Sequence, residues 1–577
     1  MISQSSRSDP NMAQETKSGI ATDSYVDNQP SGAAGEVVQA RYGHDGLKRS
    51  LSSRHIQMIA IGSNIGTGLY IGTGSALKAG GPAALVIAFL TIIFAQYFMM
   101  TSLTEMGIHY PVTGSFVSYS SRFIDPVRLP STPYKVIYRG GTNIPEALGF
   151  AVGWQYWGCW IAVFAVEATA FNVILSYWGD CIPIAGAIAL FCALTCLINF
   201  LPVRVFGEAE FYTSSIKIIS VIGFIIVGLV LIGGGGPTGE KFDGSYWKDP
   251  GPFAQGFHGM AAVFVTAAFA TGGTEIVGVI SGESASPRHN MPRATRTVWF
   301  RIFVFYVVTV VIITILVPFT DPKLLGGSDV NSSPLVVAVK HAGIGVLPDI
   351  LNAIILVCVM SVGTTSLYAS ARMLLYLSTQ NMAPHIFGRT DSQGRPLPAL
   401  ILTSTIGTGL SFLNVSNTGA VVFGWFSSLS GTAFFIFSLT IFTCNWRWRA
   451  AQEAQGINIL TGEPFPYVQW GYPYAPITGF ILVFFMLVCN GYTSIWPLEG
   501  SPNATHFFAR YLGVPVCIFM WAGWKIWHRT WWLYIKPGNV DLQFERRMLR
   551  DHPEEMEILE EHAAKTRWQK ALSYVNL

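Results

Sequence analysis

The stretch Gly62-Ser63-Asn64-Ile65-Gly66-Thr67-Gly68 interrupts a hydrophobic segment at residues 56–77. A second interruption, Thr271-Gly272-Gly273-Thr274-Glu275, lies inside the hydrophobic segment 260–280. Hydrocarbon cannot satisfy the backbone N–H and C=O groups that such a break frees, so a lipid-facing helix gains nothing from either interruption. Paired breaks at corresponding places in the two halves of a membrane protein predict a substrate site at the bilayer midplane, as in secondary transporters.

The composition is that of a membrane protein rather than of several soluble domains. Of the 577 residues, 51% are hydrophobic and 12% are charged, whereas soluble chains carry about 25% charge. The eight cysteines lie mostly in apolar runs without ligand-like neighbours, which favours core packing over a metal site. We find no nucleophile–base pair and no phosphate loop, so we expect no enzyme, no cofactor, no metal and no nucleic-acid partner.

Windows of about 20 mostly apolar residues, the length that crosses a bilayer, predict an all-α polytopic membrane protein with twelve transmembrane helices. The predicted spans are 55–77, 82–106, 148–178, 183–201, 210–233, 259–280, 298–319, 347–377, 398–413, 419–444, 476–492 and 507–528.

Basic residues orient these spans, because they concentrate in the cytosolic loops of membrane proteins. They gather before the first span, between spans two and three, and after spans six, eight and ten, which predicts that both termini are cytosolic. Residues 1–54 are polar and lack an apolar core, which predicts a disordered cytosolic tail. Residues 529–577 form a second cytosolic tail, either simply solvated or docking regulatory partners.

Each break suggests its own chemistry. Gly66-Thr67-Gly68 would open a half-helix whose unpaired N–H groups suit a carboxylate. The alternative is close helix packing through Gly62, Gly66 and Gly72. The second break would leave backbone carbonyls free at the end of a half-helix, and these suit an ammonium group. Together the two breaks describe a site for a zwitterion such as an α-amino acid.

Among the ionisable residues within or beside the spans, where a charge needs a partner or a purpose, three are candidates for the site or for coupling. Glu167 is central in span three, Lys217 lies in span five and Glu275 follows the second break. Each of these residues could belong to a structural ion pair. A buried lysine is also suited to carry a proton.

Several motifs resemble those of fungal amino-acid permeases of the amino acid–polyamine–organocation superfamily, most of all the general amino-acid permeases of the yeast branch. They include Ser53-Arg54-His55-Ile56-Gln57-Met58, Gly66-Thr67-Gly68-Leu69-Tyr70-Ile71-Gly72, Pro111-Val112-Thr113-Gly114-Ser115-Phe116, Gly207-Glu208-Ala209-Glu210-Phe211 and Arg395-Pro396-Leu397-Pro398.

The resemblance implies a LeuT-like fold of two inverted five-helix repeats, at about 55–233 and 259–444, plus two extra helices at about 476–528. It also implies plasma-membrane symport of L-amino acids driven by the proton gradient. By position, the substrate carboxylate would be held by Ser63, Gly66, Thr67 and Gly68, and the amino group would face Ala270, Thr271, Gly272 and Gly273. Lys217 matches the lysine that takes the place of a coupling sodium ion in related transporters.

The side-chain pocket of such a permease comes from spans three, six, eight and ten, and we expect a broad substrate range, with a narrower basic or neutral range as the alternative. The chain departs from the family pattern by an insertion at 127–146 on the cytosolic side. A non-transporting amino-acid sensor on the same scaffold is the rival function. Sensors of this family carry a large cytosolic extension, whereas only residues 1–54 precede the first span here.

Overall fold

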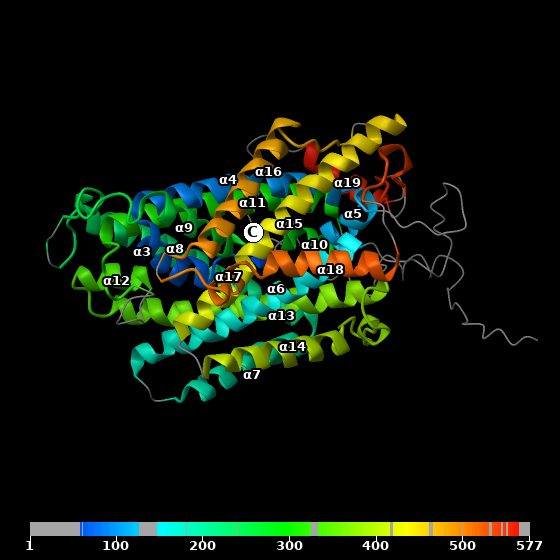
Figure 1. Ribbon diagram of the computed structural model, residues 1–577. Helices are drawn as coiled ribbons and strands as arrows, with labels where there is room; N and C mark the ends of the chain where they lie inside the picture. Colours follow the sequence, from blue (N-terminus) through cyan, green and yellow to red (C-terminus); the bar gives the residue numbers. More distant parts are fainter. Residues whose placement is uncertain are drawn as a thin grey trace, which may run out of the picture. The chain divides into compact units, whose positions relative to one another are not determined.

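The computed structural model describes residues 58–60, 62–125, 147–179, 182–237, 239, 241–284, 286–324, 333–415, 419–460, 465–498, 500–529, 533–543, 546–549 and 552–564. The expected N-terminal tail 1–54 and the expected insertion 127–146 lie outside these residues. All regular elements of the described residues are helical (Figure 1).

Nine of the described helices lie in segments that are long and apolar enough to cross a membrane. They are α4 (Pro82–Gly107), α6 (Ala147–Leu175), α8 (Val203–Ile232), α9 (Gly256–Thr271), α11 (Pro287–Leu316), α13 (Leu347–Thr379), α14 (Leu397–Ser411), α15 (Gly419–Gln455) and α16 (Tyr474–Ile495). Further helices lie between and after them: α3 (Thr73–Gly80), α5 (Ser115–Phe123), α7 (Ile184–Phe200), α10 (Ile276–Ile280), α12 (Pro334–His341), α17 (Ala504–Tyr511), α18 (Gly513–Trp527) and α19 (Pro553–Ala564).

Within the described residues, nine segments are long and apolar enough to cross a membrane, and a bent helix pair makes a tenth. The chain is therefore a multi-pass membrane protein, while the number twelve stays a prediction. Three expected spans account for the difference. The span at 55–77 is broken, α7 is a shorter apolar helix, and the span at 507–528 is divided into α17 and α18, which meet at 73°.

Two spans extend well beyond their predicted limits. The helix expected at 298–319 is α11, which begins at Pro287 because proline suits the first turn of a helix, where its missing N–H is not needed. The helix expected at 419–444 is α15, which continues to Gln455. Hydrophobicity predicts where a helix crosses the bilayer, but the helix itself runs on into polar sequence.

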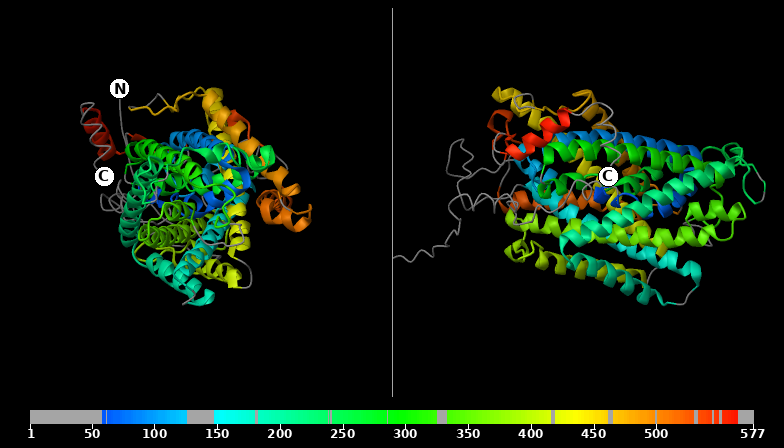
Figure 2. Two further views of the ribbon diagram at one scale, coloured as in Figure 1. Left: turned by 90° about the vertical axis from the view of Figure 1, so that its left-hand side faces the viewer. Right: turned by 180° about the vertical axis from the view of Figure 1, so that it is seen from behind.

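Helix α6 is the central helix of the bundle and α8 is a peripheral one. Helix α6 packs against α13, α15 and α14, and 78% of its most apolar window is buried, against 33% for α8. The outer side chains of α8, such as Ile219, are apolar and exposed, as is expected where lipid is the solvent. Figure 2 shows α17 and α18 (orange) on the outside of the bundle.

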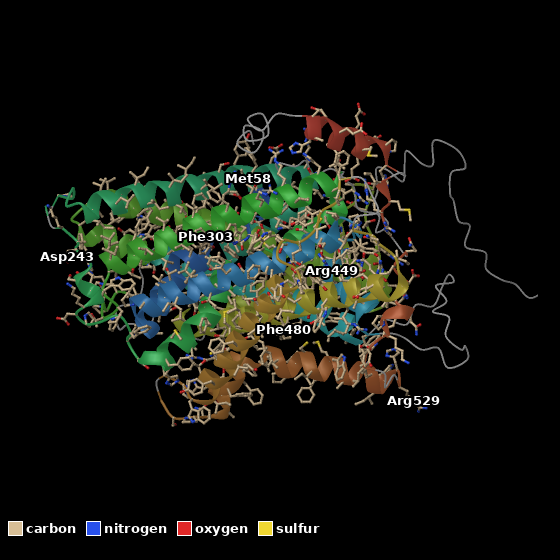
Figure 3. The ribbon with its side chains drawn as sticks, turned by 90° about the horizontal axis from the view of Figure 1, so that it is seen from above. Met58, Asp243, Phe303, Arg449, Phe480 and Arg529 are labelled. Atoms are coloured by element: carbon tan, nitrogen blue, oxygen red, sulfur yellow. The ribbon has the colours of Figure 1, made fainter. Side chains whose placement is uncertain are left out.

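The chain after α18 packs against one end of the helices. The Tyr110 hydroxyl donates to the Leu542 carbonyl (2.8 Å), and the Arg547 amide donates to the His109 carbonyl (2.8 Å). The Glu555 carboxylate accepts from the Arg288 amide at the start of α11 (2.8 Å). The described part of the C-terminal tail is thus docked on the protein's own helices. Figure 3 shows Arg449 and Arg529 toward one end of the bundle and Asp243 at the other.

Candidate functional site

The first break leaves the chain without α-helical pairing for several residues. Between the helical residues 58–60 and 62 and helix α3, the backbone passes through residues 63–66 and a π-helical turn at Gly68–Gly72. The Leu69 and Tyr70 amides both donate to the Gly66 carbonyl (3.1 and 3.2 Å). The second half-helix therefore starts at Gly66-Thr67-Gly68, where the sequence predicts it.

The second break separates α9 from α10. Helix α9 ends at Thr271, Gly272 is extended, and Gly273 has φ +98°, a conformation that glycine adopts at little cost. The Glu275 carboxylate accepts from the Gly273 amide (3.1 Å), which closes this turn.

The two breaks touch each other directly. The Ser63 hydroxyl lies 3.3 Å from the Gly273 carbonyl and 3.1 Å from the Ala60 carbonyl, and it donates its one proton to either of them. A Cβ on Gly68 would lie 2.2 Å from Ala270 Cα, so only glycine allows the two backbones to come this close. Gly68 is therefore a point of close backbone contact between the two breaks.

Side chains from three other helices satisfy carbonyls that the breaks free. The Lys217 ammonium, on α8, donates to the Gly62 carbonyl (2.6 Å), and the Gln96 amide, on α4, donates to the Thr271 carbonyl (2.9 Å). The Tyr306 hydroxyl, on α11, lies within hydrogen-bond distance of two further carbonyls, those of Asn64 and Ala270. These contacts replace the water that the bilayer core lacks.

A cavity lies between the two breaks. Its lining combines polar groups of the first break with apolar side chains from four helices. The lining residues are Ser63, Asn64, Gly66, Thr67, Gly68, Trp160, Val163, Glu167, Phe269, Gly272, Val362 and Phe434. The Thr67 hydroxyl donates to the Glu167 carboxylate inside this cavity (2.6 Å).

Six of the eleven residues expected at the site line the cavity: Ser63, Gly66, Thr67, Gly68, Gly272 and Glu167. The other five lie next to it, outside the lining: Ala270, Thr271, Gly273, Lys217 and Glu275. The carbonyls of Ala270, Thr271 and Gly273 already have donors, which are the Tyr306 hydroxyl, the Gln96 amide and the Ile276 backbone amide. Among the described residues, nothing donates to the Gly272 carbonyl, which is therefore the carbonyl of this break best placed for an ammonium group.

The wall of the cavity comes from the expected helices, but its residues were not predicted one by one. Trp160 and Val163 lie on α6, Val362 on α13 and Phe434 on α15, which correspond to spans three, eight and ten. Helix α6 is apolar on every side, so no periodicity reveals which of its residues face the cavity. Gln96 and Tyr306 were also missed, since a single polar group in an apolar helix does not indicate its partner.

Known proteins resemble this chain over most of its length. The family model described as "Amino acid permease" matches residues 55–132 and 141–536, and the gap falls inside the insertion expected at 127–146. The general amino-acid permease GAP2 of Candida albicans is 40% identical, over 92% of this chain and 87% of its own length. The histidine permease of Saccharomyces cerevisiae is 36% identical over 97% and 90%. The S-adenosylmethionine permease GAP4 of Candida albicans is 36% identical over 90% and 81%.

Proposed function

This chain belongs to the amino acid permease family, and on that premise we propose that it imports L-amino acids across the plasma membrane together with protons. The proposed architecture has twelve spans, two inverted five-helix repeats with two extra helices, and both termini in the cytosol. The relatives are transporters, and the proposal describes no enzymatic step.

The observation that carries the proposal is the pairing of opposite polarities across one cavity. On one side lies the start of a half-helix, with the Thr67 hydroxyl and the partly positive end of the helix dipole. On the other side lies the end of α9, with the carbonyl of Gly272. A carboxylate and an ammonium on one α-carbon match these two sides, which supports a zwitterionic amino acid as the substrate.

The lining also bears on the substrate range. Trp160, Phe269 and Phe434 give the side-chain pocket an aromatic wall, and Glu167 adds one carboxylate. Apolar, aromatic and cationic side chains suit this pocket, whereas a second carboxylate would meet Glu167 in a medium of low dielectric constant. We propose a broad range that excludes acidic amino acids, with a range narrow for basic amino acids as the alternative.

Proton coupling is proposed at Lys217. Its side chain is fully buried, and its ammonium holds the Gly62 carbonyl at the edge of the first break. The titratable groups whose charge acts on it are Glu210, Glu167 and Cys358. Loss of the lysine proton would weaken this hold on the first break and thereby favour a different arrangement of the two helix bundles.

Uptake of labelled amino acids by cells that lack their own permeases tests the function. We expect saturable, concentrative uptake that is faster at external pH 5 than at pH 7 and that a protonophore abolishes. No uptake of any amino acid, with normal amounts of protein at the cell surface, would support the sensor instead.

The variant Lys217→Met tests the coupling. Methionine keeps much of the aliphatic volume but cannot titrate, so we expect exchange of amino acids to persist while uphill accumulation and pH dependence are lost. Concentrative, pH-sensitive uptake by this variant would contradict the proton role. Little surface protein would indicate that the lysine is needed for folding, as in a structural ion pair.

A further inference from the structure

The Tyr306 hydroxyl lies between the two breaks. Its oxygen is 2.7 Å from the carbonyl oxygen of Asn64 in the first break and 2.8 Å from that of Ala270 in the second. Tyr306 is fully buried, and its ring packs on Phe89 (centroids 6.1 Å apart, 28° between planes). The hydroxyl is thus held at this position by the packing of α11 against α4.

A phenol has one proton, so it donates one full hydrogen bond at a time. Both carbonyls need a donor, because each lies where its helix breaks and, in the part of the chain that the structure describes, neither accepts from a backbone amide. Both contacts are as short as an ordinary O–H···O hydrogen bond. The two breaks therefore share one donor, and the strength of its bond to one carbonyl depends on its bond to the other.

We propose that Tyr306 is a positioning residue that couples the two halves of the substrate site. It does not line the cavity, so it acts on the substrate through the backbones of Asn64 and Ala270. An amino acid that brings its ammonium to the end of α9 supplies positive charge beside the second break. The phenol proton is then free to hold the Asn64 carbonyl, which fixes the first break for the substrate carboxylate.

This role rests on the proposed function and predicts a particular kinetic change in Tyr306→Phe. Without the hydroxyl the two breaks align independently, so the arrangement that binds both ends of the substrate is less populated. The apparent affinity for the substrate falls in proportion to the fraction of molecules that remain in this arrangement. We expect KM for a neutral amino acid to rise about tenfold while the maximal rate per surface molecule changes less than threefold.

The matched control is Tyr119→Phe. Tyr119, on α5, is also fully buried, but its hydroxyl donates to the Tyr110 carbonyl (2.6 Å) and reaches neither break nor the cavity lining. We expect its KM to stay within twofold of the wild-type value. Where Tyr306→Phe does not reach the surface, Tyr306→Met repeats the test, since methionine adapts to irregular gaps and also lacks a hydroxyl.

Hydrogen exchange of the purified proteins adds a readout that does not depend on transport. In the Tyr306 variant the amides of both breaks should exchange faster together, and leucine should slow their exchange less than in the wild type. An unchanged KM in whichever Tyr306 variant reaches the surface, or faster exchange in one break alone, would overturn the coupling role. A wild-type protein that neither binds nor transports any amino acid would instead overturn the proposed function.

Discussion

The hydroxyl of Thr67 donates a 2.6 Å hydrogen bond to the carboxylate of Glu167. Both side chains are buried, and both line the cavity between the two helix breaks. The group expected to receive the substrate's carboxylate is thus already bonded to a carboxylate of the protein. Under the proposed function, Glu167 would either give up this bond to the substrate carboxylate or turn toward a positive group of the substrate.

The variant Glu167→Gln should change the substrate preference. Glutamine keeps an oxygen that can accept from Thr67, but it removes the negative charge that attracts a cationic side chain in a medium of low dielectric constant. We expect arginine uptake to fall about tenfold and leucine uptake to fall less than threefold, measured in the same cells at equal surface density.

The control for this preference is Glu275→Gln. Glu275 is also buried, but it bonds the Gly273 amide and lies outside the lining. Its replacement should therefore alter arginine and leucine uptake by the same factor. An arginine-to-leucine ratio that stays constant in Glu167→Gln would show that this carboxylate does not face the substrate's side chain.

Gly66 and Gly68 should respond differently to alanine. A Cβ on Gly66 would lie 2.7 Å from Cγ2 of Val362, which is a side-chain clash at the cavity wall. We expect Gly66→Ala to reach the surface and to transport at least tenfold more slowly. The double variant Gly66→Ala/Val362→Ala removes the clashing methyl group and should recover part of the rate.

In Gly68→Ala the added atom would meet the backbone of Ala270 at 2.2 Å, and no side-chain truncation relieves that contact. We expect little protein at the surface, measured by surface biotinylation.

For Gly66, the double variant Gly66→Ala/Val362→Ala decides between two roles. Full recovery of transport by this variant would assign Gly66 to packing, whereas no recovery at all would favour backbone contact with the substrate.

The carboxylate of Glu105 should stabilise the folded protein. This fully buried carboxylate at the end of α4 pairs with Arg449 (Nε–Oε2 3.0 Å) and accepts from the Asn445 amide (2.9 Å) and the Gln469 backbone (2.8 Å). Glu105→Gln leaves the arginine without its counter-charge, which costs about 3 kcal/mol for a buried pair. A marked drop in Tm of the purified protein is expected, and Glu560→Gln, on the exposed side of α19, should leave Tm unchanged. Equal Tm values for the two variants would contradict this role.

His109 predicts a pH dependence of stability. It follows α4, is buried, and packs on Trp448. Burial, together with the charges of Arg288 and Arg546, lowers the pKa of His109 from its ordinary value to about 3. The folded protein therefore keeps this imidazole neutral, while the unfolded chain takes up a proton below about pH 6.5.

The stabilising contribution of neutral His109 is complete above about pH 6.5 and decreases as the pH falls toward 3. At pH 5.5 the loss is about 1.4 kcal/mol. The variant His109→Phe lacks the group that takes up a proton on unfolding. Its Tm should therefore fall less than that of the wild type between pH 7 and pH 5. If the Tm of the two proteins changed with pH in parallel, His109 would be excluded as a source of the pH dependence of stability.

Much of the architecture could be read from the residues alone. Long apolar runs make helices of membrane-spanning length, because the bilayer leaves the backbone no other partners. The same reasoning locates both breaks, since Gly66-Thr67-Gly68 and Gly272-Gly273 have neither the side chains nor the helical propensity of a lipid-facing segment. Helix α8 begins seven residues before its predicted start and α15 ends eleven after its predicted end, because polar sequence continues a helix without any hydrophobic signal.

Which side chains face the breaks is decided by tertiary structure only. Gln96, Tyr306 and Lys217 lie far from the breaks in sequence, yet each donates to a carbonyl that a break frees. Their identity depends on how α4, α11 and α8 are rotated and shifted against one another. A helix with apolar residues on all sides carries no periodic pattern from which that rotation can be inferred. Local sequence therefore determines where the helices break, and the packing of distant helices determines what satisfies the breaks and shapes the cavity between them.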